Sequence, residues 1–184
     1  MGAYGDAGCI ITNDDSLAER CRLFANHGAI EKHKHRIEGI NSRMDGIQAA
    51  VLNVKLPHIL AWNEQRIANA ALYNKYLADI LEIQLPKVRP SSKHTFHIYM
   101  IRTPQREALM AFLKEKEIDS AIHYPLALPN MEAYNYLGYK STDFPVASTY
   151  QNEILSLPMY AELSEEQIAW IATCIKDFFR LNKR

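Results

Sequence analysis

Residues 58–85 contain neither glycine nor proline, and this uninterrupted stretch constrains the fold more than any other feature of the sequence. Its alanine-rich centre and spaced aromatic and aliphatic residues favour one long helix. The helix is expected to begin at Pro57, since proline is tolerated in a first helical turn, and to end at about Leu81. A helix of about 24 residues spans about 36 Å, which is more than one small domain needs. The sequence therefore predicts a helix that links two domains.

The residues before this helix predict a unit that is too small to bury a core of its own. A glycine-bearing turn over residues 2–8 leads into an apolar strand at 9–12. Ser16 and Glu19 have the spacing of a capping box, which predicts a helix that begins there and ends at about Ala25. We expect the strand to belong to the end of a larger sheet.

Strand and helix signals alternate after the linking helix. The expected elements are strands at 96–101 and 120–123, helices at 104–116 and 145–154, a loop at 125–145, a short apolar piece at 155–157 and a last helix that opens at Ser164. Ser164 and Gln167 again have capping-box spacing. The alternation predicts the α/β class for this part of the chain.

Charge and cysteine content argue against several classes of function. Lysine plus arginine and aspartate plus glutamate both number 21, so no net field would attract nucleic acid or an anionic membrane. The three cysteines lack C-x-x-C spacing, which argues against a disulfide framework or a zinc site. No apolar run approaches the roughly 20 residues that span a bilayer. We expect a cytoplasmic protein with no metal site and no nucleic-acid or membrane partner.

Three polar residues precede the helix that is expected from Asp45. Asn41, Ser42 and Arg43 supply an amide, a hydroxyl and a guanidinium near a helix N-terminus, a combination that suits a phosphate or carboxylate. In a purely structural interpretation, Asp45 caps the helix and Arg43 pairs with a carboxylate. The pattern alone leaves both interpretations open.

Histidines occur in two further motifs. His123 and Tyr124 follow the expected strand at 120–123, where a histidine can face a cleft and act as an acid, a base or a hydrogen-bond donor. The alternative is a half-buried histidine whose partner is backbone. His33 and His35 lie in a basic loop over residues 29–42 without an acidic or cysteine partner at ligand spacing, so a solvated loop is expected there rather than a metal site.

These motifs, in this order, resemble the C-terminal half of the DegT/DnrJ/EryC1/StrS aminotransferases. The matching stretches are residues 2–8, 26–28, 41–50, 55–56, 62–66, 122–125 and 133–134. The most specific of them is the asparagine-arginine-aspartate-glutamine block within 41–50. Members of this family use pyridoxal phosphate and mostly act on nucleotide-linked keto-sugars.

The resemblance implies a fold-type-I aminotransferase, an α/β architecture in which a small C-terminal domain closes on a large cofactor-binding domain. In that framework residues 1–56 would be the end of the large domain, 57–81 the interdomain helix and 82–184 the small α/β domain. Two subunits share each active site in the family, so a homodimer is implied.

The resemblance also assigns roles to residues. Asn41 would reach the cofactor phosphate of the neighbouring subunit, His123 and Tyr124 would line the sugar–nucleotide entrance, and Arg43 would help to orient its loop. In the family, the lysine that forms the Schiff base with pyridoxal phosphate lies just before the turn at 2–8. No lysine in this sequence matches it, so we expect no catalytic residue in this chain and no transamination by the chain alone.

The implied reaction is amino transfer from a donor such as glutamate to a nucleotide-linked keto-sugar, for a surface polysaccharide or a related glycan. Two alternatives remain: a noncatalytic remnant, or one half of a split aminotransferase whose other half supplies the lysine. Dehydratase relatives that lack the lysine also fit. Many members carry a histidine shortly after the His-Tyr-Pro motif, where this sequence has Leu126 to Pro129, so the sugar stays undetermined.

Overall fold

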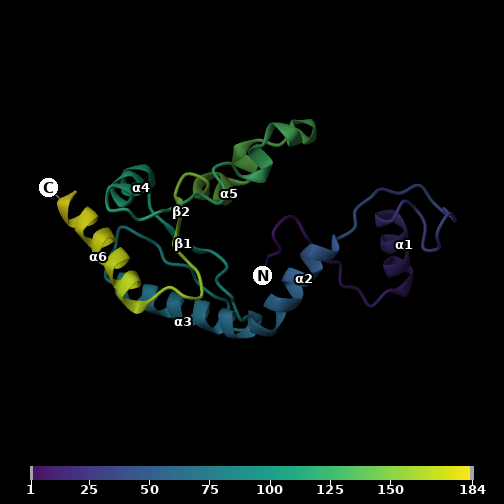
Figure 1. The fold of residues 1–184 in the computed structure, drawn as a ribbon. Coiled ribbons are helices and arrows are strands. Elements are labelled where there is room, and N and C mark those ends of the chain that lie inside the picture. The colour runs from purple at the N-terminus through teal and green to yellow at the C-terminus, as the bar shows by residue number, and fades with distance from the viewer. Residues whose placement is uncertain (1, 183–184) are drawn as a thin grey trace. The chain divides into compact units, whose positions relative to one another are not determined.

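The computed structural model describes residues 2–182, which fold as two compact units. The first unit is Met1–Leu60 and the second is Ala61–Arg184. Figure 1 shows helices in both units and the two strands in the second. The division falls within a helix, and the domain limits expected from the family at residues 56 and 81 stay a prediction.

The first unit contains helices α1 (Asp15–Ala25) and α2 (Gly46–Lys55). Helix α1 ends at Ala25, as predicted, but its N-cap is Asp14, whose carboxylate accepts a hydrogen bond from the Leu17 amide at 3.0 Å. The predicted cap at Ser16 is wrong because the Asp14 carboxylate already satisfies a free amide of the first turn.

The apolar strand predicted at residues 9–12 does not form. Within the described part of the chain, these residues pair with no other strand, and the side chains of Ile10 and Ile11 are 71% and 91% exposed. A strand needs a neighbouring backbone to satisfy its amides and carbonyls, and the described residues provide no such partner for this segment.

The predicted long helix is shorter than expected at both ends. A 3-10 turn, η1 (Leu56–His58), contains Pro57, and helix α3 (Ile59–Leu77) follows it. At the far end the Ile80 amide bonds to the Leu77 carbonyl, a tighter turn that ends the helix before Leu81. Helix α3 belongs to the second unit from Ala61 onward.

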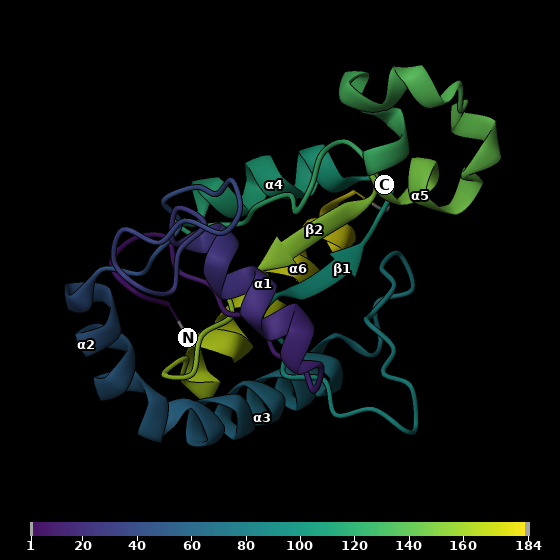
Figure 2. The same ribbon diagram turned by 90° about the vertical axis from the view of Figure 1, so that its right-hand side faces the viewer.

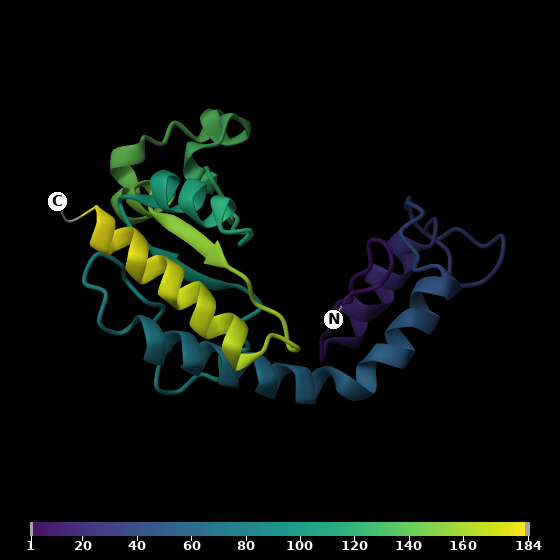
Figure 3. The same ribbon diagram turned by 60° about the vertical axis from the view of Figure 1, so that its left-hand side comes forward.

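The second unit is built on two antiparallel strands, β1 (Tyr99–Arg102) and β2 (Ile154–Leu157). Figures 2 and 3 show helices α3, α4 (Arg106–Glu115) and α6 (Glu165–Leu181) around this ribbon. The side chains that face the helices are almost fully buried: Tyr99, Ile101, Leu155 and Leu157. The opposite face of β1 carries the partly exposed Met100 and Arg102.

Two buried tyrosines join the strands to helix α3. The rings of Tyr73 and Tyr99 stack with centroids 4.7 Å apart. The Tyr73 hydroxyl donates to the Pro158 carbonyl at 2.9 Å, and the Tyr99 hydroxyl donates to Asn74 Oδ1 at 2.7 Å. Burial raises the pKa of both phenols, so the two hydroxyls serve as neutral hydrogen-bond donors inside the core.

The strand predictions for the second unit are only partly correct. Strand β1 begins at Tyr99 rather than at residue 96, and residues 120–123 contribute a single bridge, Ala121 to Ser156. Strand β2 occupies the apolar piece at 155–157 and begins one residue earlier, at the expected end of the preceding helix. That helix, α5 (Pro145–Tyr150), ends early, and this leaves Ile154 free to pair with β1.

The last helix is correctly predicted in its start and its cap. Ser164 Oγ accepts from the Gln167 amide, and Gln167 Oε1 accepts from the Ser164 amide at 2.9 Å, which completes the capping box. Between β1 and β2 the remaining elements are three 3-10 turns: η2 (Leu128–Asn130), η3 (Glu132–Leu137) and η4 (Ser141–Asp143). Among the residues that the structure describes, no helix is long and apolar enough to cross a bilayer.

Two glycines allow the loop after α1 to fold back on the helix end. Gly28 has φ +78°, and a Cβ there would lie 1.7 Å from the Ile37 carbonyl oxygen. A Cβ on Gly39 would lie 2.3 Å from the Gly28 amide nitrogen, which is backbone and cannot swing aside. This close approach lets the Ile40 amide bond to the Phe24 carbonyl at 2.8 Å.

We expect Gly39→Ala to break this packing. The amides of Ile40 and Ser42, which bond to the end of α1, should lose hydrogen-exchange protection. The free energy of opening at these amides should fall by more than about 1 kcal/mol. Gly46→Ala is the matched control, because a Cβ there meets nothing within 4 Å. Equal protection of the two amides in both variants would contradict the packing argument.

An ion pair between the turn that follows α3 and helix α6 makes the second unit sensitive to acid. Lys176 Nζ lies 2.9 Å from Asp79 Oδ1 and donates a hydrogen bond to Asp79 Oδ2 at 3.1 Å. This hydrogen bond holds the pKa of the Asp79 carboxyl below its usual value of 3.8. A lowered pKa contributes stability above the unfolded value, and that contribution disappears as the pH falls through the folded value.

Asp79→Asn should therefore lower the urea midpoint at neutral pH, and its difference from the wild type should vanish as the pH falls through the lowered pKa of Asp79. Tryptophan fluorescence reports on this unit because Trp62 and Trp170 both lie in it. Asp119→Asn, at an exposed aspartate, is the control. A difference between Asp79→Asn and wild type that is independent of pH would contradict the assignment.

Candidate functional site

In the first unit, Asn41 and Arg43 lie against the end of helix α1. Arg43 Nε donates to Asn41 Oδ1 at 3.1 Å, and its Nη1 donates to Asn26 Oδ1 at 3.3 Å. Asn26 and Asn41 also form an antiparallel bridge, and the Ser42 amide bonds to the Ala25 carbonyl at 2.9 Å. The tertiary structure thus joins two motifs that the sequence presents separately, residues 26–28 and 41–43.

The charge of Arg43 is not neutralised by the protein. Both of its hydrogen-bond acceptors are amide oxygens, and no carboxylate pairs with it among the described residues. The structural interpretation, in which Arg43 pairs with a carboxylate, is therefore wrong. Asp45 does occupy the N-cap of α2, but its side chain makes no capping hydrogen bond.

Helix α2 holds the glycine-bearing turn at residues 2–8. Gln48 Oε1 accepts a hydrogen bond from the Tyr4 amide at 2.8 Å, and Lys55 Nζ donates to the Gly2 carbonyl at 2.6 Å. The Lys55 ammonium also lies 5.5 Å from the centroid of the Tyr4 ring. Gln48 and Lys55 both belong to motifs of the family resemblance, and in this chain they position the turn.

The turn, the segment at residues 9–12, helix α1 and residues 41–44 line an open pocket of about 820 Å³. Its wall contains Asn41, Ser42 and Arg43, and no lysine is among the described residues that line it. Because Asn41 Oδ1 accepts from Arg43, its Nδ2 is left as a donor in a wall that also contains Ser42 and the uncompensated guanidinium. Such a set of donors and positive charge suits the phosphate of pyridoxal phosphate.

The basic loop is held by hydrogen bonds and ion pairs of its own. His35 Nδ1 lies 2.7 Å from the His27 carbonyl oxygen, so this nitrogen carries a proton, because a carbonyl only accepts. Arg36 pairs with Glu19 at 2.5 Å. Within the described residues, no group of three or more histidine, cysteine, aspartate or glutamate side chains has the geometry to hold a metal ion.

In the second unit, His123 is anchored by a side chain rather than by backbone. Its Nδ1 lies 2.9 Å from the hydroxyl of Ser156, a buried residue of β2. The ring of Tyr124 meets the His123 ring edge-on, with centroids 5.5 Å apart, and the Tyr124 side chain is 69% exposed. The pair presents one fixed imidazole and one accessible phenol.

Amide side chains hold the segment that follows Tyr124. Gln151 Oε1 accepts from the Ala127 amide at 2.8 Å and from Asn130 Nδ2 at 3.0 Å. These bonds connect the segment after Tyr124 to the end of helix α5.

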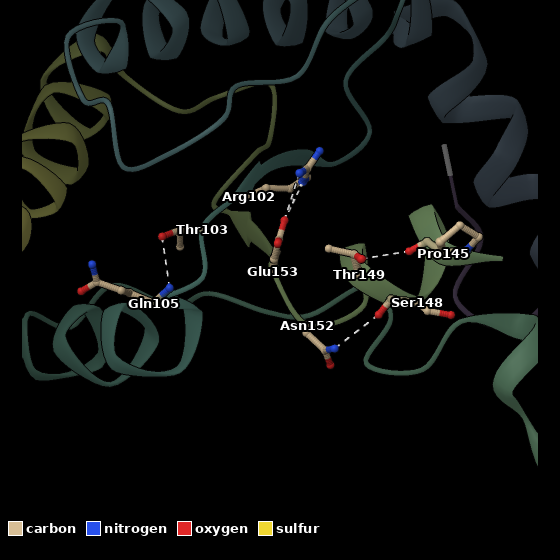
Figure 4. A network of polar contacts seen from close by, with 8 residues as sticks. All are labelled: Arg102, Thr103, Gln105, Pro145, Ser148, Thr149, Asn152 and Glu153. Atoms are coloured by element: carbon tan, nitrogen blue, oxygen red, sulfur yellow. Dashed lines mark hydrogen bonds and ion pairs between the residues drawn. The ribbon is translucent and has the colours of Figure 1, made fainter. Parts of the chain in front are cut away.

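Next to this segment, Arg102 donates through Nε and Nη2 to Glu153 Oε2 at 3.1 and 3.0 Å, as Figure 4 shows. The Arg102 guanidinium also lies 3.4 Å from the centroid of the Tyr150 ring. These contacts connect β1 to the chain that leads into β2.

Sequence reasoning missed Ser156, Gln151 and the pair of Arg102 with Glu153. Ser156 had one usable signal, a polar residue inside the otherwise apolar run at 154–157. The others had none, because their partners lie 21 or more residues away in the sequence.

Sequence comparison matches almost all of the chain to one family. The model of the DegT/DnrJ/EryC1/StrS aminotransferase family matches residues 1–176. A pleiotropic regulatory protein of Geobacillus stearothermophilus is 46% identical over 98% of this chain and 49% of its own length. The dTDP-3-amino-3,4,6-trideoxy-alpha-D-glucose transaminase of Streptomyces venezuelae is 34% identical over 97% of this chain and 47% of its own length.

Solved structures agree with this placement. DesV of S. venezuelae superposes with a TM-score of 0.92 at 34% identity, covering 96% of this chain and 48% of DesV. An aminotransferase of the same family from Brucella abortus gives a TM-score of 0.86 at 34% identity, covering 96% of this chain and 47% of the other. The predicted fold, part of an α/β aminotransferase, is confirmed. The chain belongs to the DegT/DnrJ/EryC1/StrS aminotransferase family, and it spans about half the length of the relatives that it matches.

Proposed function

We propose that this chain contributes the C-terminal part of a pyridoxal-phosphate-dependent aminotransferase that acts on a nucleotide-linked keto-sugar. The observation that carries the proposal is the uncompensated charge and free donors at Asn41 and Arg43, in a chain of this family. Relatives support the substrate class: one is a dTDP-sugar transaminase, and another, 38% identical, is the UDP-N-acetyl-3-dehydro-alpha-D-glucosamine 3-aminotransferase of Acidithiobacillus ferrooxidans.

In this proposal the two units have different tasks. Asn41 donates through Nδ2 to the cofactor phosphate of a neighbouring subunit, while Arg43, oriented by two amide oxygens, fixes the loop and adds positive charge beside the anion. His123 and Tyr124 line the sugar–nucleotide entrance, the first as a fixed hydrogen-bond donor and the second as an exposed aromatic surface. Pyridoxal phosphate supplies the electron sink that amino transfer needs.

The wider assignment is part of the same proposal. The complete enzyme is a cytoplasmic homodimer that takes its amino group from a donor such as glutamate and serves polysaccharide or related glycan biosynthesis. The alternative is a noncatalytic remnant, or one half of a split aminotransferase whose other half supplies the lysine.

The 184 residues alone are expected not to transaminate, because none of their lysines matches the one that forms the Schiff base in the family. The purified chain, mixed with pyridoxal phosphate, glutamate and a keto-sugar nucleotide, should form 2-oxoglutarate no faster than free pyridoxal phosphate does. Faster formation of 2-oxoglutarate, together with cofactor fixed by borohydride to one lysine of the chain, would contradict this expectation.

Asn41→Asp tests the phosphate contact, because a carboxylate in place of the amide repels a phosphate. The affinity of the chain for pyridoxal phosphate should fall about tenfold or more, while that for pyridoxal, which has no phosphate, should stay unchanged. Equilibrium dialysis with both compounds measures the difference. Asn152→Asp, an exposed amide of the second unit with the same change of charge, is the control. Equal losses for both compounds would argue against a phosphate contact.

A further inference from the structure

The backbone of Ser156 has a neighbour on each side of β2, Ala121 on one side and Met100 of β1 on the other. Its amide donates to the Ala121 carbonyl at 2.8 Å, and its carbonyl accepts from the Ala121 amide at 3.1 Å. Ser156 therefore faces Met100 of β1 as a non-hydrogen-bonded pair, in which side chains lie close together on one face of the ribbon. That face is opposite to the one that packs on the helices.

The same bridge positions His123. Ala121 is held to Ser156, and two residues later the chain returns the His123 imidazole to the Ser156 hydroxyl, 2.9 Å from Nδ1. The Ser156 side chain is only 5% exposed, and its hydroxyl has no other hydrogen-bond partner among the described residues. One backbone bridge and one side-chain bond thus fix the ring.

The direction of this hydrogen bond follows from the surroundings of Ser156. If Nδ1–H donated to the hydroxyl, the serine proton would be buried without an acceptor, at a cost of about 1–3 kcal/mol. If the serine donates to Nδ1, only spare lone pairs of its oxygen stay unused, which proteins tolerate more readily. The second arrangement is therefore favoured, and it leaves the proton of the neutral ring on Nε2.

We propose that Ser156 is the positioning residue for His123: it donates to Nδ1, and it thereby presents Nε2–H as a hydrogen-bond donor to an oxygen of the nucleotide-linked substrate. The proposal rests on the proposed function in placing His123 at the substrate entrance. The ligand atom has the chemistry of an acceptor oxygen, in a phosphate, a sugar hydroxyl or a carbonyl group. A hydrogen-bond donor such as a protonated amine would not fit.

The protonation pattern of His123 tests the first half of the proposal without any ligand. Long-range ¹H–¹⁵N spectra of the full chain, recorded at alkaline pH, should show the proton on Nε2 and a hydrogen-bonded Nδ1. Ser156→Ala should shift the Nδ1 resonance to that of a solvated ring. The matched control is Ser120→Ala, because the Ser120 hydroxyl is buried without a partner in the described chain, so its loss removes no hydrogen bond. A proton on Nδ1 in the wild type, or an unchanged spectrum in Ser156→Ala, would overturn the proposal.

Binding of UDP-N-acetylglucosamine to the same variants tests the second half. Ser156→Ala should weaken binding about three- to tenfold, while Ser156→Thr, which keeps the hydroxyl, and Ser120→Ala should bind as the wild type does. His123→Ala tests the substrate role of His123 separately from the positioning role of Ser156. If it has no effect, the substrate role of His123 in the proposed function fails, whatever the spectra show. If it weakens binding while Ser156→Ala does not, the positioning role of Ser156 is refuted and the proposed function stands.

Discussion

The pairing of β1 with β2 is the constraint on which the second unit depends. One face of this two-stranded ribbon buries Tyr99, Ile101 and their partners on β2 against three helices, and a two-stranded ribbon without such cover is at best marginally stable. The opposite face carries the polar residues Arg102 and Ser156 beside Met100 and Ile154. Ser156 lies on that face, and it holds His123 there, so the apolar packing of the ribbon also fixes a candidate binding residue.

The first unit is held together by different means. Leu23 and Ala29 are its buried hydrophobic side chains within the described residues, so apolar burial contributes little. Backbone hydrogen bonds between the end of α1 and residues 40–42 hold it instead, and the close approach of Gly28 and Gly39 makes them possible. This arrangement places Asn41 and Arg43 with free donors at the surface, where a proposed phosphate contact needs them.

Elements with strong local signals could be predicted from the sequence. Helix α1 ends at Ala25, and the capping box of Ser164 and Gln167 opens α6, because caps and apolar stripes depend on neighbours three or four residues away. The strands could be predicted only in part. Residues 9–12 have the composition of a strand and no partner, whereas Ile154 looked like the end of a helix and pairs with Arg102, 52 positions earlier.

The site shows the same division. The sequence by itself determined the family and the residue types, since the order of its motifs implies Asn41, Arg43, His123 and Tyr124 as site residues. Only the tertiary structure decided that amide oxygens rather than a carboxylate orient Arg43, and that Ser156 rather than backbone anchors His123. The reason is physical: the partner of a charged or polar group is set by which groups the fold brings within about 3 Å, and sequence spacing does not encode that distance.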